Sequence, residues 1–346
     1  MGKKLFDFCI GNPPYQEQND QNGRQPPVYH LFMDAAYEVA SCVELITPAR
    51  FLFNAGQTPK AWNQKILNDV HFKVINYTPD AGSIFPNTDI KGGCTVTLRN
   101  EKKEFGAIEV FTAYPELNNI IKEVSLIQGK NGKYIDNIVS SRGNYRTTEE
   151  FAKRYPYAAE RLGKGTGNMI ASNFFEKLPE LLKEQSGEKT DYYQFLCRIN
   201  NKRTICNIRK QFVQDNNFIR GYNVACPKSN GSGHFGEILS STEILEPNKG
   251  ATDTFISIGI FDTLNEARNL QKYIKTKFFR ALLGAKKVTQ DNPKNVWSMI
   301  PLQDFTLSSD IDWSKSIHEI DQQLYKKYGL NQEEIDFIEK NVKEMA

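Results

Sequence analysis

A short apolar segment that ends in Asn-Pro-Pro-Tyr constrains the fold of this chain more than any other feature. Residues 5–10 read LFDFCI, and Gly11 follows them. An apolar, aromatic run bounded by such a turn signal predicts a buried β-strand. Pro13 and Pro14 have a fixed φ and lack the N–H that a continuing strand would donate, so the strand ends here. In open α/β sheets, ligands bind beside the loops that follow such strand ends.

The residues after this strand combine hydrogen-bond acceptors with an aromatic ring. The side-chain carbonyl of Asn12 and a backbone carbonyl within Pro13-Pro14 can each accept one hydrogen from an amino group. This arrangement turns the nitrogen lone pair toward an electrophile, so that catalysis depends on positioning. Tyr15 can stack on a nucleobase that has left the duplex and replace part of the lost stacking, worth roughly a few kcal/mol. A plain proline turn after a core strand is the alternative interpretation.

At these residues the chain resembles the amino-group DNA methyltransferases, specifically the gamma-type adenine-N6 enzymes of type IIG-like restriction-modification systems. The resemblance implies transfer of a methyl group from S-adenosylmethionine to a flipped adenine in double-stranded DNA. It implies that Asn12, Pro13, Pro14 and Tyr15 hold the target amino group. Residues 84–89 (IFPNTD) resemble the family's later motif, which supplies a second aromatic against the base. Phe85 is the candidate for that aromatic, and core packing is its alternative role.

The elements that follow predict an α/β fold with only the second half of a Rossmann-like methyltransferase sheet. Strands are expected at 43–47, 72–77 and 94–98, and a helix at 59–68. A further helix is expected to bury the residues that recur at helical spacing before the first of these strands, namely Val28, Leu31, Phe32, Ala35, Ala36 and Val39.

The glycine-rich turn that holds the cofactor precedes the motif in the gamma arrangement, yet only eleven residues precede Asn12 here. Two later glycine-rich segments, 163–167 and 231–236, lack the preceding strand and following helix that such a turn requires. We therefore expect the S-adenosylmethionine-binding half to lie on a separate polypeptide or to be absent. An N-terminal methyltransferase half or a restriction subunit is the expected partner.

Composition favours an ordinary globular protein of the cytoplasm. Of the 346 residues, 39% are hydrophobic and 25% charged, which is typical of folded chains. The six cysteines form no C-x-x-C pair and the four histidines are dispersed, so no metal site or disulfide framework is expected. No apolar run is long enough to predict a membrane span.

The net charge of +3 is too small to indicate nucleic-acid binding, but two basic runs without acids are more informative. The first run, 198–210, supplies Arg198, Lys202 and Arg203 as candidate phosphate contacts. The second lies on a predicted helix with an apolar face at 267–281. It supplies the candidates Lys272, Lys275, Lys277, Arg280, Lys286 and Lys287. Arg24, in the polar loop 16–27, is a further candidate; a solvated surface is the alternative for each of them.

Three domains are expected. Residues 1–115 would form the catalytic half-sheet, 116–300 a mixed α+β target-recognition domain, and 301–346 a helical C-terminal tail. The favoured function is an adenine-N6 DNA methyltransferase chain, and the alternative is a DNA-recognition or specificity module without its own catalysis. An RNA or protein amide methyltransferase uses similar motifs, but would not need a large basic recognition domain.

Overall fold

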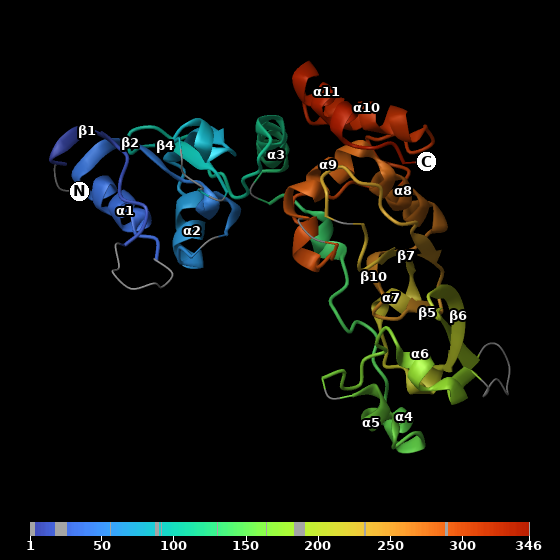
Figure 1. The fold of residues 1–346 in the computed structure, drawn as a ribbon. Helices are drawn as coiled ribbons and strands as arrows, with labels where there is room; N and C mark the ends of the chain where they lie inside the picture. The colour runs from blue at the N-terminus through green and yellow to red at the C-terminus, as the bar shows by residue number, and fades with distance from the viewer. Residues whose placement is uncertain are drawn as a thin grey trace. The chain divides into compact units, whose positions relative to one another are not determined.

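The computed structural model describes residues 4–17, 26–55, 57–86, 90, 92–129, 131–163, 165–182, 191–231, 233–287 and 290–345. The chain forms two compact units, residues 1–118 and 119–346, and helix α3 (Pro115–Gln128) crosses the boundary (Figure 1). Among the described residues, no helix has the length and apolar character of a membrane span. The cytoplasmic location remains a prediction.

The first unit is built around one four-stranded sheet with the strand order β1-β2-β4-β3. Its strands are β1 (Phe6–Gly11), β2 (Ala40–Pro48), β3 (Phe72–Thr78) and β4 (Cys94–Asn100). Strand β1 is parallel to β2, whereas β4 is antiparallel to both β2 and β3. The helices are α1 (Tyr29–Val39) and α2 (Lys60–Leu67), and the short η1 (Arg50–Phe53) and η2 (Ala81–Ser83) follow β2 and β3. The expected strands at 43–47, 72–77 and 94–98 all lie within these elements.

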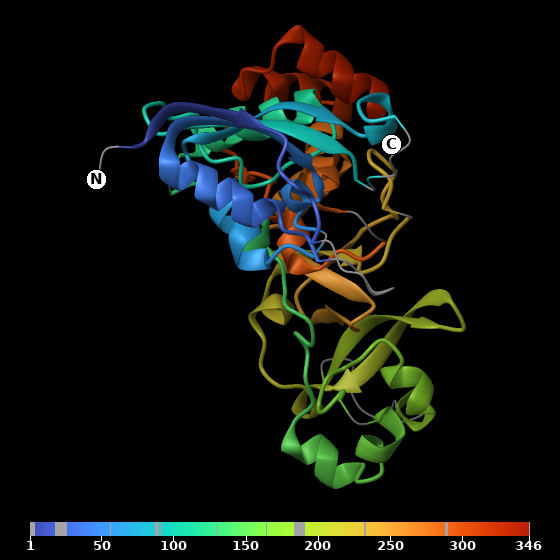
Figure 2. The ribbon, with the colours of Figure 1, turned by 60° about the vertical axis from the view of Figure 1, so that its left-hand side comes forward.

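The core of the first unit lies on the sheet face that α1 and α2 cover (Figure 2). Val43 and Leu45 of β2 point to this face, where they join Met33 of α1 and Ile66 of α2. The expected buried face of α1 is wrong. The helix buries Tyr29, Met33 and Tyr37, whereas the side chains of Leu31 and Phe32 are 58% and 45% exposed. Two tyrosines at i and i+8 therefore determine the helix orientation, because their rings carry more apolar area than the aliphatic positions.

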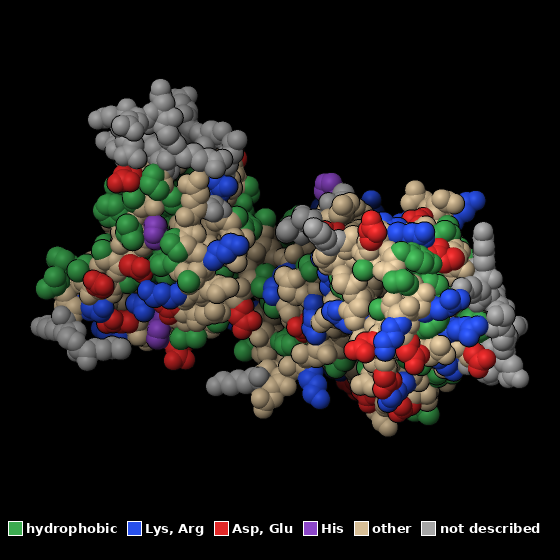
Figure 3. Space-filling model, turned by 90° about the horizontal axis from the view of Figure 1, so that it is seen from below, with side chains coloured by type: hydrophobic (Ala, Val, Ile, Leu, Met, Phe, Trp, Pro, Cys, Tyr) green, Lys and Arg blue, Asp and Glu red, His purple; other side chains and the backbone are tan. Residues whose placement is uncertain are grey.

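The expectation that β1 is a buried strand is also wrong. Phe8 is 71% exposed and Ile10 is 78% exposed. In register with β2, Phe8 lies opposite Cys42 and Ile10 opposite Glu44, so both point away from the face that α1 covers. Among the described residues β1 pairs only with β2, which leaves it as an edge strand. Figure 3 shows hydrophobic side chains at the surface of the first unit.

The second unit contains two three-stranded sheets. In the first, with order β6-β5-β9, β5 (Tyr192–Ile199) is antiparallel to β6 (Lys202–Arg209) and parallel to β9 (Lys249–Ala251). The second, β10-β7-β8, is antiparallel and comprises β7 (Tyr222–Pro227), β8 (Glu243–Leu245) and β10 (Phe255–Phe261). Short helices accompany them: η3 (Ile135–Ile138), α4 (Glu149–Arg154), α5 (Ala158–Leu162), α6 (Phe174–Lys177), η4 (Pro179–Leu182), η6 (Lys210–Phe212), α7 (Asn217–Arg220) and η7 (Lys294–Trp297).

The single basic helix expected across 267–281 is two helices, α8 (Leu264–Lys275) and α9 (Lys277–Lys286). Thr276 separates them with φ −61° and ψ 150°, which are extended values. Its hydroxyl accepts a hydrogen bond from the N–H of Phe279 and donates one to the carbonyl of Tyr273. A capping threonine therefore ends one helix and begins the next, although the apolar spacing continues through it.

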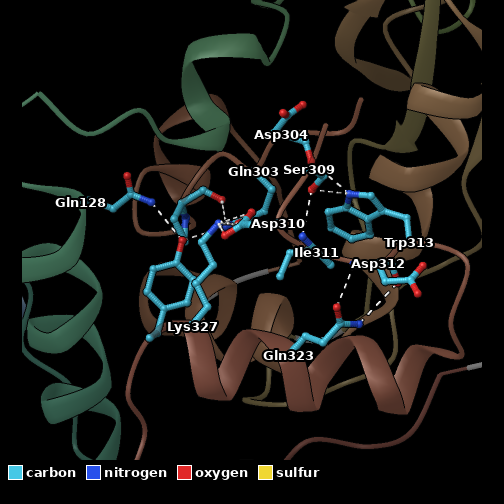
Figure 4. Close-up of polar contacts among 12 residues, drawn as sticks. Gln128, Gln303, Asp304, Ser309, Asp310, Ile311, Asp312, Trp313, Gln323 and Lys327 are labelled. Atoms are coloured by element: carbon cyan, nitrogen blue, oxygen red, sulfur yellow. Dashed lines mark hydrogen bonds and ion pairs between the residues drawn. The ribbon is translucent and has the colours of Figure 1, made fainter. Parts of the chain in front are cut away.

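The C-terminal tail forms α10 (Ile317–Lys327) and α11 (Gln332–Asn341) and packs onto α8 and α9 of the same unit. Capping boxes at Ser316 and Asn331 begin the two helices. Lys327 binds Gln303 and Asp310, and the indole N–H of Trp313 donates to the carbonyl of Asp304 (Figure 4). Residues 301–346 belong to the same compact unit as 119–300. The division of this region into recognition domain and tail remains a prediction.

Candidate functional site

The end of β1 places the Asn-Pro-Pro-Tyr segment at one edge of the first unit's sheet. Because β1 and β2 are parallel, their carboxyl ends meet at this edge. Strand β4 begins there, since Pro48 at the end of β2 lies opposite Cys94. The N–H of Ala49 donates to the carbonyl of Gly93 at 2.9 Å and ties the two loops together. Asn12 thus emerges where several loops converge, as ligand sites in open α/β sheets do.

The backbone after the motif is held by a short antiparallel bridge. The N–H of Val28 donates to the carbonyl of Tyr15 at 3.1 Å, and Gln16 pairs with Pro27. Asn12 and Pro14 are exposed, whereas Pro13 and Tyr15 are half-buried. The amide of Asn12 is therefore accessible at a point where the backbone on both sides is fixed.

Tyr15 has an unusual environment for its hydroxyl. Burial raises the pKa of this phenol to about 12; the Cys94 thiol adds to the rise and the Asn12 side chain opposes it. The phenol oxygen is buried and has no partner of good hydrogen-bond geometry among the described residues. Tyr15 therefore stays neutral near pH 7.

The structure brings Phe85 to Tyr15. Their ring centroids lie 6.4 Å apart at an interplanar angle of 74°, an edge-to-face contact. Phe85 follows η2, and its N–H donates to the carbonyl of Ala81 at 2.8 Å. Asp80 caps η2 by accepting the N–H of Gly82. The two predicted aromatics therefore form one cluster. The angle between the two rings excludes a slot with two parallel aromatic walls.

Arg50 is a residue that the sequence analysis did not single out. It opens η1 directly after β2, and its side chain is exposed. A Cβ on Gly92, whose φ is +88°, would lie only 2.7 Å from the Cγ of Arg50. The Arg50 side chain therefore packs against Gly92, where the positive φ and the lack of space for a Cβ both favour glycine. Its place immediately after a parallel strand was the available signal, because strand ends gather at one sheet edge.

The two glycine-rich segments of the second unit have other surroundings than a cofactor-binding turn. Gly163 has φ +91° and caps helix α5, so no strand leads into this segment. In the other segment the N–H of Gly233 donates to Oε1 of Glu237 at 3.1 Å, and β8 is the next element rather than a helix. Neither segment is the strand-turn-helix that binds a cofactor of this type.

The first basic run lies on the β5–β6 hairpin. Arg198 and Arg203 are directly opposite each other and share one face, whereas Lys202 points to the other. All three are exposed. Arg203 donates to Glu243 at 2.9 Å and to the carbonyl of Ser241 at 2.6 Å. Their contact with DNA remains a prediction.

The second basic run is largely engaged within the fold. Arg280 and Lys287 are only 2% and 5% exposed, so the expectation that they meet phosphates is wrong. Lys287 binds the carboxylate of Glu237 and donates to the carbonyl of Asn230 at 2.9 Å. Arg280 donates to the backbone carbonyls of Lys275 at 3.2 Å and Glu237 at 3.4 Å, so both buried cations are bonded within the fold.

The neighbouring lysines of this run also have partners. Lys272 donates to the carbonyl of Trp313 at 2.6 Å, Lys277 pairs with Glu339, and Lys286 donates to the hydroxyl of Ser298 at 2.7 Å. The lysines of α8 and α9 therefore bind the tail and adjoining loops of the same unit. Lys275 is half-exposed, and its contact with a DNA phosphate remains a prediction. Arg24 lies outside the described residues.

Known proteins resemble parts of this chain. The model of the family described as Eco57I restriction-modification methylase matches residues 1–85. An uncharacterized adenine-specific methylase from Mycoplasma pneumoniae is 31% identical over 97 residues, which are 27% of this chain and 23% of that protein. The chain therefore spans about a quarter of this relative's length. The type IIG restriction endonuclease BpuSI matches with a TM-score of 0.31 and 11% identity over 93% of this chain and 50% of its own; such a score does not establish a common fold.

Proposed function

We propose that this chain is part of a restriction-modification DNA methyltransferase and holds the target adenine for methylation at N6. One observation carries the proposal: Asn12 and Tyr15 lie together at the carboxyl end of β1, and Phe85 contacts Tyr15 there. The family match over residues 1–85, which contain all three residues, and the methylase relative support it. The ligand would be double-stranded DNA.

In the proposed site each residue has a distinct role. The Asn12 carbonyl and a backbone carbonyl of Pro13 or Pro14 accept the two amino hydrogens of adenine. The ring of Tyr15 stacks on the base, which compensates for roughly a few kcal/mol of lost stacking. Phe85 limits the space beside the base. Arg50, exposed at the same edge, is placed to bind a phosphate next to the flipped nucleotide.

The methyl donor implied by the resemblance, S-adenosylmethionine, would bind on a partner polypeptide that supplies the cofactor half. The exposed side chains of Phe8 and Ile10 support this proposal. Large apolar side chains on the exposed face of an edge strand are an unusual surface for a chain that acts alone. A restriction subunit is a further partner of the proposed system, whose location would be the cytoplasm.

The alternative is a DNA-recognition module without catalysis. Methyl transfer distinguishes the two functions. The chain is assayed alone and mixed with a candidate cofactor-binding polypeptide, and labelled methyl groups on adenine N6 of duplex DNA are counted. Asn12→Ala is expected to lower transfer by about 100-fold or more, as the loss of one positioned catalytic hydrogen-bonding group does. DNA affinity should change less than about twofold.

Tyr15 provides a matched pair of variants. Tyr15→Ala removes the stacking surface and should lower turnover, while Tyr15→Phe keeps the ring and should retain most of it. An equal loss of DNA binding in Asn12→Ala and Tyr15→Ala would contradict the assignment. Specific DNA binding without transfer by the mixture would favour the recognition module.

A further inference from the structure

A series of polar side chains connects helix α2 to the end of η1, the short helix that begins with Arg50. The hydroxyl of Thr58 donates to the Oδ1 atom of Asn63 at 2.7 Å. The Nδ2 group of Asn63, on α2, donates in turn to the Oδ1 atom of Asn54 at 3.3 Å. Thr58 is 5% exposed and Asn63 only 1%, whereas Asn54 is exposed. These hydrogen bonds therefore lead from the core of the first unit to its surface. We call them the Asn63 network.

The burial of Asn63 indicates that its hydrogen bonds have a purpose beyond packing. Asn63 shares the buried face of α2 with large apolar residues, namely Trp62, Ile66 and Leu67. An amide in such a place is tolerated only where its donors and acceptors are bonded, because it has lost its contact with water. An apolar residue would fill the same space without that requirement. The amide is therefore better explained by what it holds than by the core around it.

The network holds the backbone around Arg50 through Asn54. Asn54 ends η1 with a φ of +52°, a left-handed conformation that few residues other than glycine and asparagine adopt. Its N–H donates to the carbonyl of Phe51 at 3.0 Å, and the N–H of Ala55 donates to the carbonyl of Arg50 at 3.1 Å. The bond from Asn63 to the Asn54 side chain stabilises this turn. The turn in turn fixes the direction in which Arg50 leaves the backbone.

The Arg50 side chain also lies close to the other end of the network. Burial raises the pKa of Tyr29 to about 12, while the Thr58 hydroxyl and the charge of Arg50 oppose the rise. The guanidinium is thus near enough to the Tyr29 phenol to act on it, and that phenol interacts with Thr58. Among the described residues, no carboxylate pairs with Arg50. The network therefore surrounds the base of an arginine whose charge is not neutralised by this part of the chain.

We propose that Asn63 and Asn54 are positioning residues that hold Arg50 in place for a DNA phosphate beside the flipped adenine. The proposal rests on the proposed function, which gives this phosphate to Arg50. Ordering a loop and a long side chain when a ligand binds costs conformational entropy, and a loop that is fixed in advance reduces that cost. Loss of the network should therefore weaken the phosphate contact while Asn12 and Tyr15 keep their roles.

A double-mutant cycle between Asn54 and Arg50 tests the proposal. Asn54→Gly removes the amide that Asn63 binds and keeps the backbone conformation, because glycine adopts a positive φ without strain. Binding is measured by anisotropy on a fluorescent duplex with one mismatched adenine, which flips at a lower cost than a paired base. Arg50→Gln should weaken binding about tenfold and flatten the slope of log K against log salt by about 0.9. Asn54→Gly should weaken binding about fivefold, but by less than about twofold when Arg50→Gln is already present.

Two further variants separate the network from general effects on the fold. Asn248→Gly is the matched control, because Asn248 is also an exposed asparagine with a positive φ, +69°, and lies before β9 in the second unit. It should change binding by less than about twofold. Asn63→Leu keeps the volume of the side chain but removes both of its hydrogen bonds, and it should reproduce the effect of Asn54→Gly. Circular dichroism and thermal unfolding identify the variants that are folded.

The possible failures are distinguishable. If the effects of Asn54→Gly and Arg50→Gln multiply in the folded double variant, Asn54 does not act through Arg50; the inference is then wrong and the proposed function stands. Unchanged binding by Asn54→Gly has the same meaning. If Arg50→Gln alone leaves affinity and slope unchanged, Arg50 contacts no phosphate and the inference loses its premise, while the roles of Asn12 and Tyr15 are unaffected. Absence of DNA binding by the unmodified chain would reject the proposed function together with the inference.

Discussion

Replacement of Lys287 by methionine tests whether the second basic run is structural. The Lys287 side chain is 4% exposed and pairs with Glu237, whose side chain is 15% exposed. Glu237 also accepts the N–H of Gly233. The substitution keeps an unbranched apolar side chain of similar length, but it leaves the carboxylate of Glu237 without its cation.

The cost follows from the burial of the pair. Breaking a fully buried ion pair by removing one partner costs about 3–5 kcal/mol. Because Glu237 retains some contact with water, we expect a decrease of about 2–4 kcal/mol in the free energy of unfolding. For a domain the size of the second unit, this lowers Tm by about 5–15 °C. The double variant Lys287→Met, Glu237→Gln should recover part of the loss, since the remaining amide is neutral and keeps one acceptor for Gly233.

Urea denaturation followed by tryptophan fluorescence measures this effect, because Trp297 is fully buried in the same unit. Lys340→Met on α11 is the control, and as an exposed lysine it should change the free energy by less than about 0.5 kcal/mol. DNA binding of Lys287→Met is measured well below its Tm, and the slope of log K against log salt should equal that of the unmodified chain. A variant of normal stability in which this slope falls by about 1 would refute the structural role and would show that Lys287 contacts a phosphate.

Two further predictions concern the tail and β1. Burial raises the pKa of Asp321 to about 6, against the opposing N–H groups of Phe278 and Lys277. The folded state therefore binds this proton more tightly than the unfolded chain; its contribution is present below about pH 4 and is lost as pH rises through 6, by about 2–3 kcal/mol. Urea titrations should show that Asp321→Asn, which cannot ionise, flattens this decline; an undiminished decline would assign it to another group. The double variant Phe8→Thr, Ile10→Thr should bind less of a hydrophobic dye, and its free energy of unfolding should change by less than about 0.5 kcal/mol per site. A decrease of several kcal/mol in that free energy would show that these side chains are packed.

The sequence predicted the elements of the first unit well, because each has strong local signals. The expected strand at 94–98 lies within β4, and the helix expected at 59–68 is observed at Lys60–Leu67. The convergence of Tyr15 and Phe85 was anticipated from the family resemblance. Periodicity alone could not have placed them together, since the contact depends on how the loops after β1 and β3 return to one sheet edge.

What the sequence could not predict depends on partners distant along the chain. The apolar residues of β1 predicted burial, yet a strand is buried only if other elements cover it. The basic run at 272–287 lacked acids nearby, but its partners Glu237 and Glu339 come from other segments. The density of basic residues along the sequence therefore overestimated the number of basic side chains that are exposed to solvent.

The link between α10 and α9 has a consequence for the order of biosynthesis. Both carboxylate oxygens of Asp321 bind the first N–H groups of α9, although Asp321 lies more than forty residues downstream. The ribosome synthesises α9 before α10. The N–H groups at the amino end of the nascent α9 therefore lack the carboxylate that they bind in the folded protein. The second unit can complete its packing only after α10 has been synthesised, and a polypeptide released before α10 would leave α9 without its anchor.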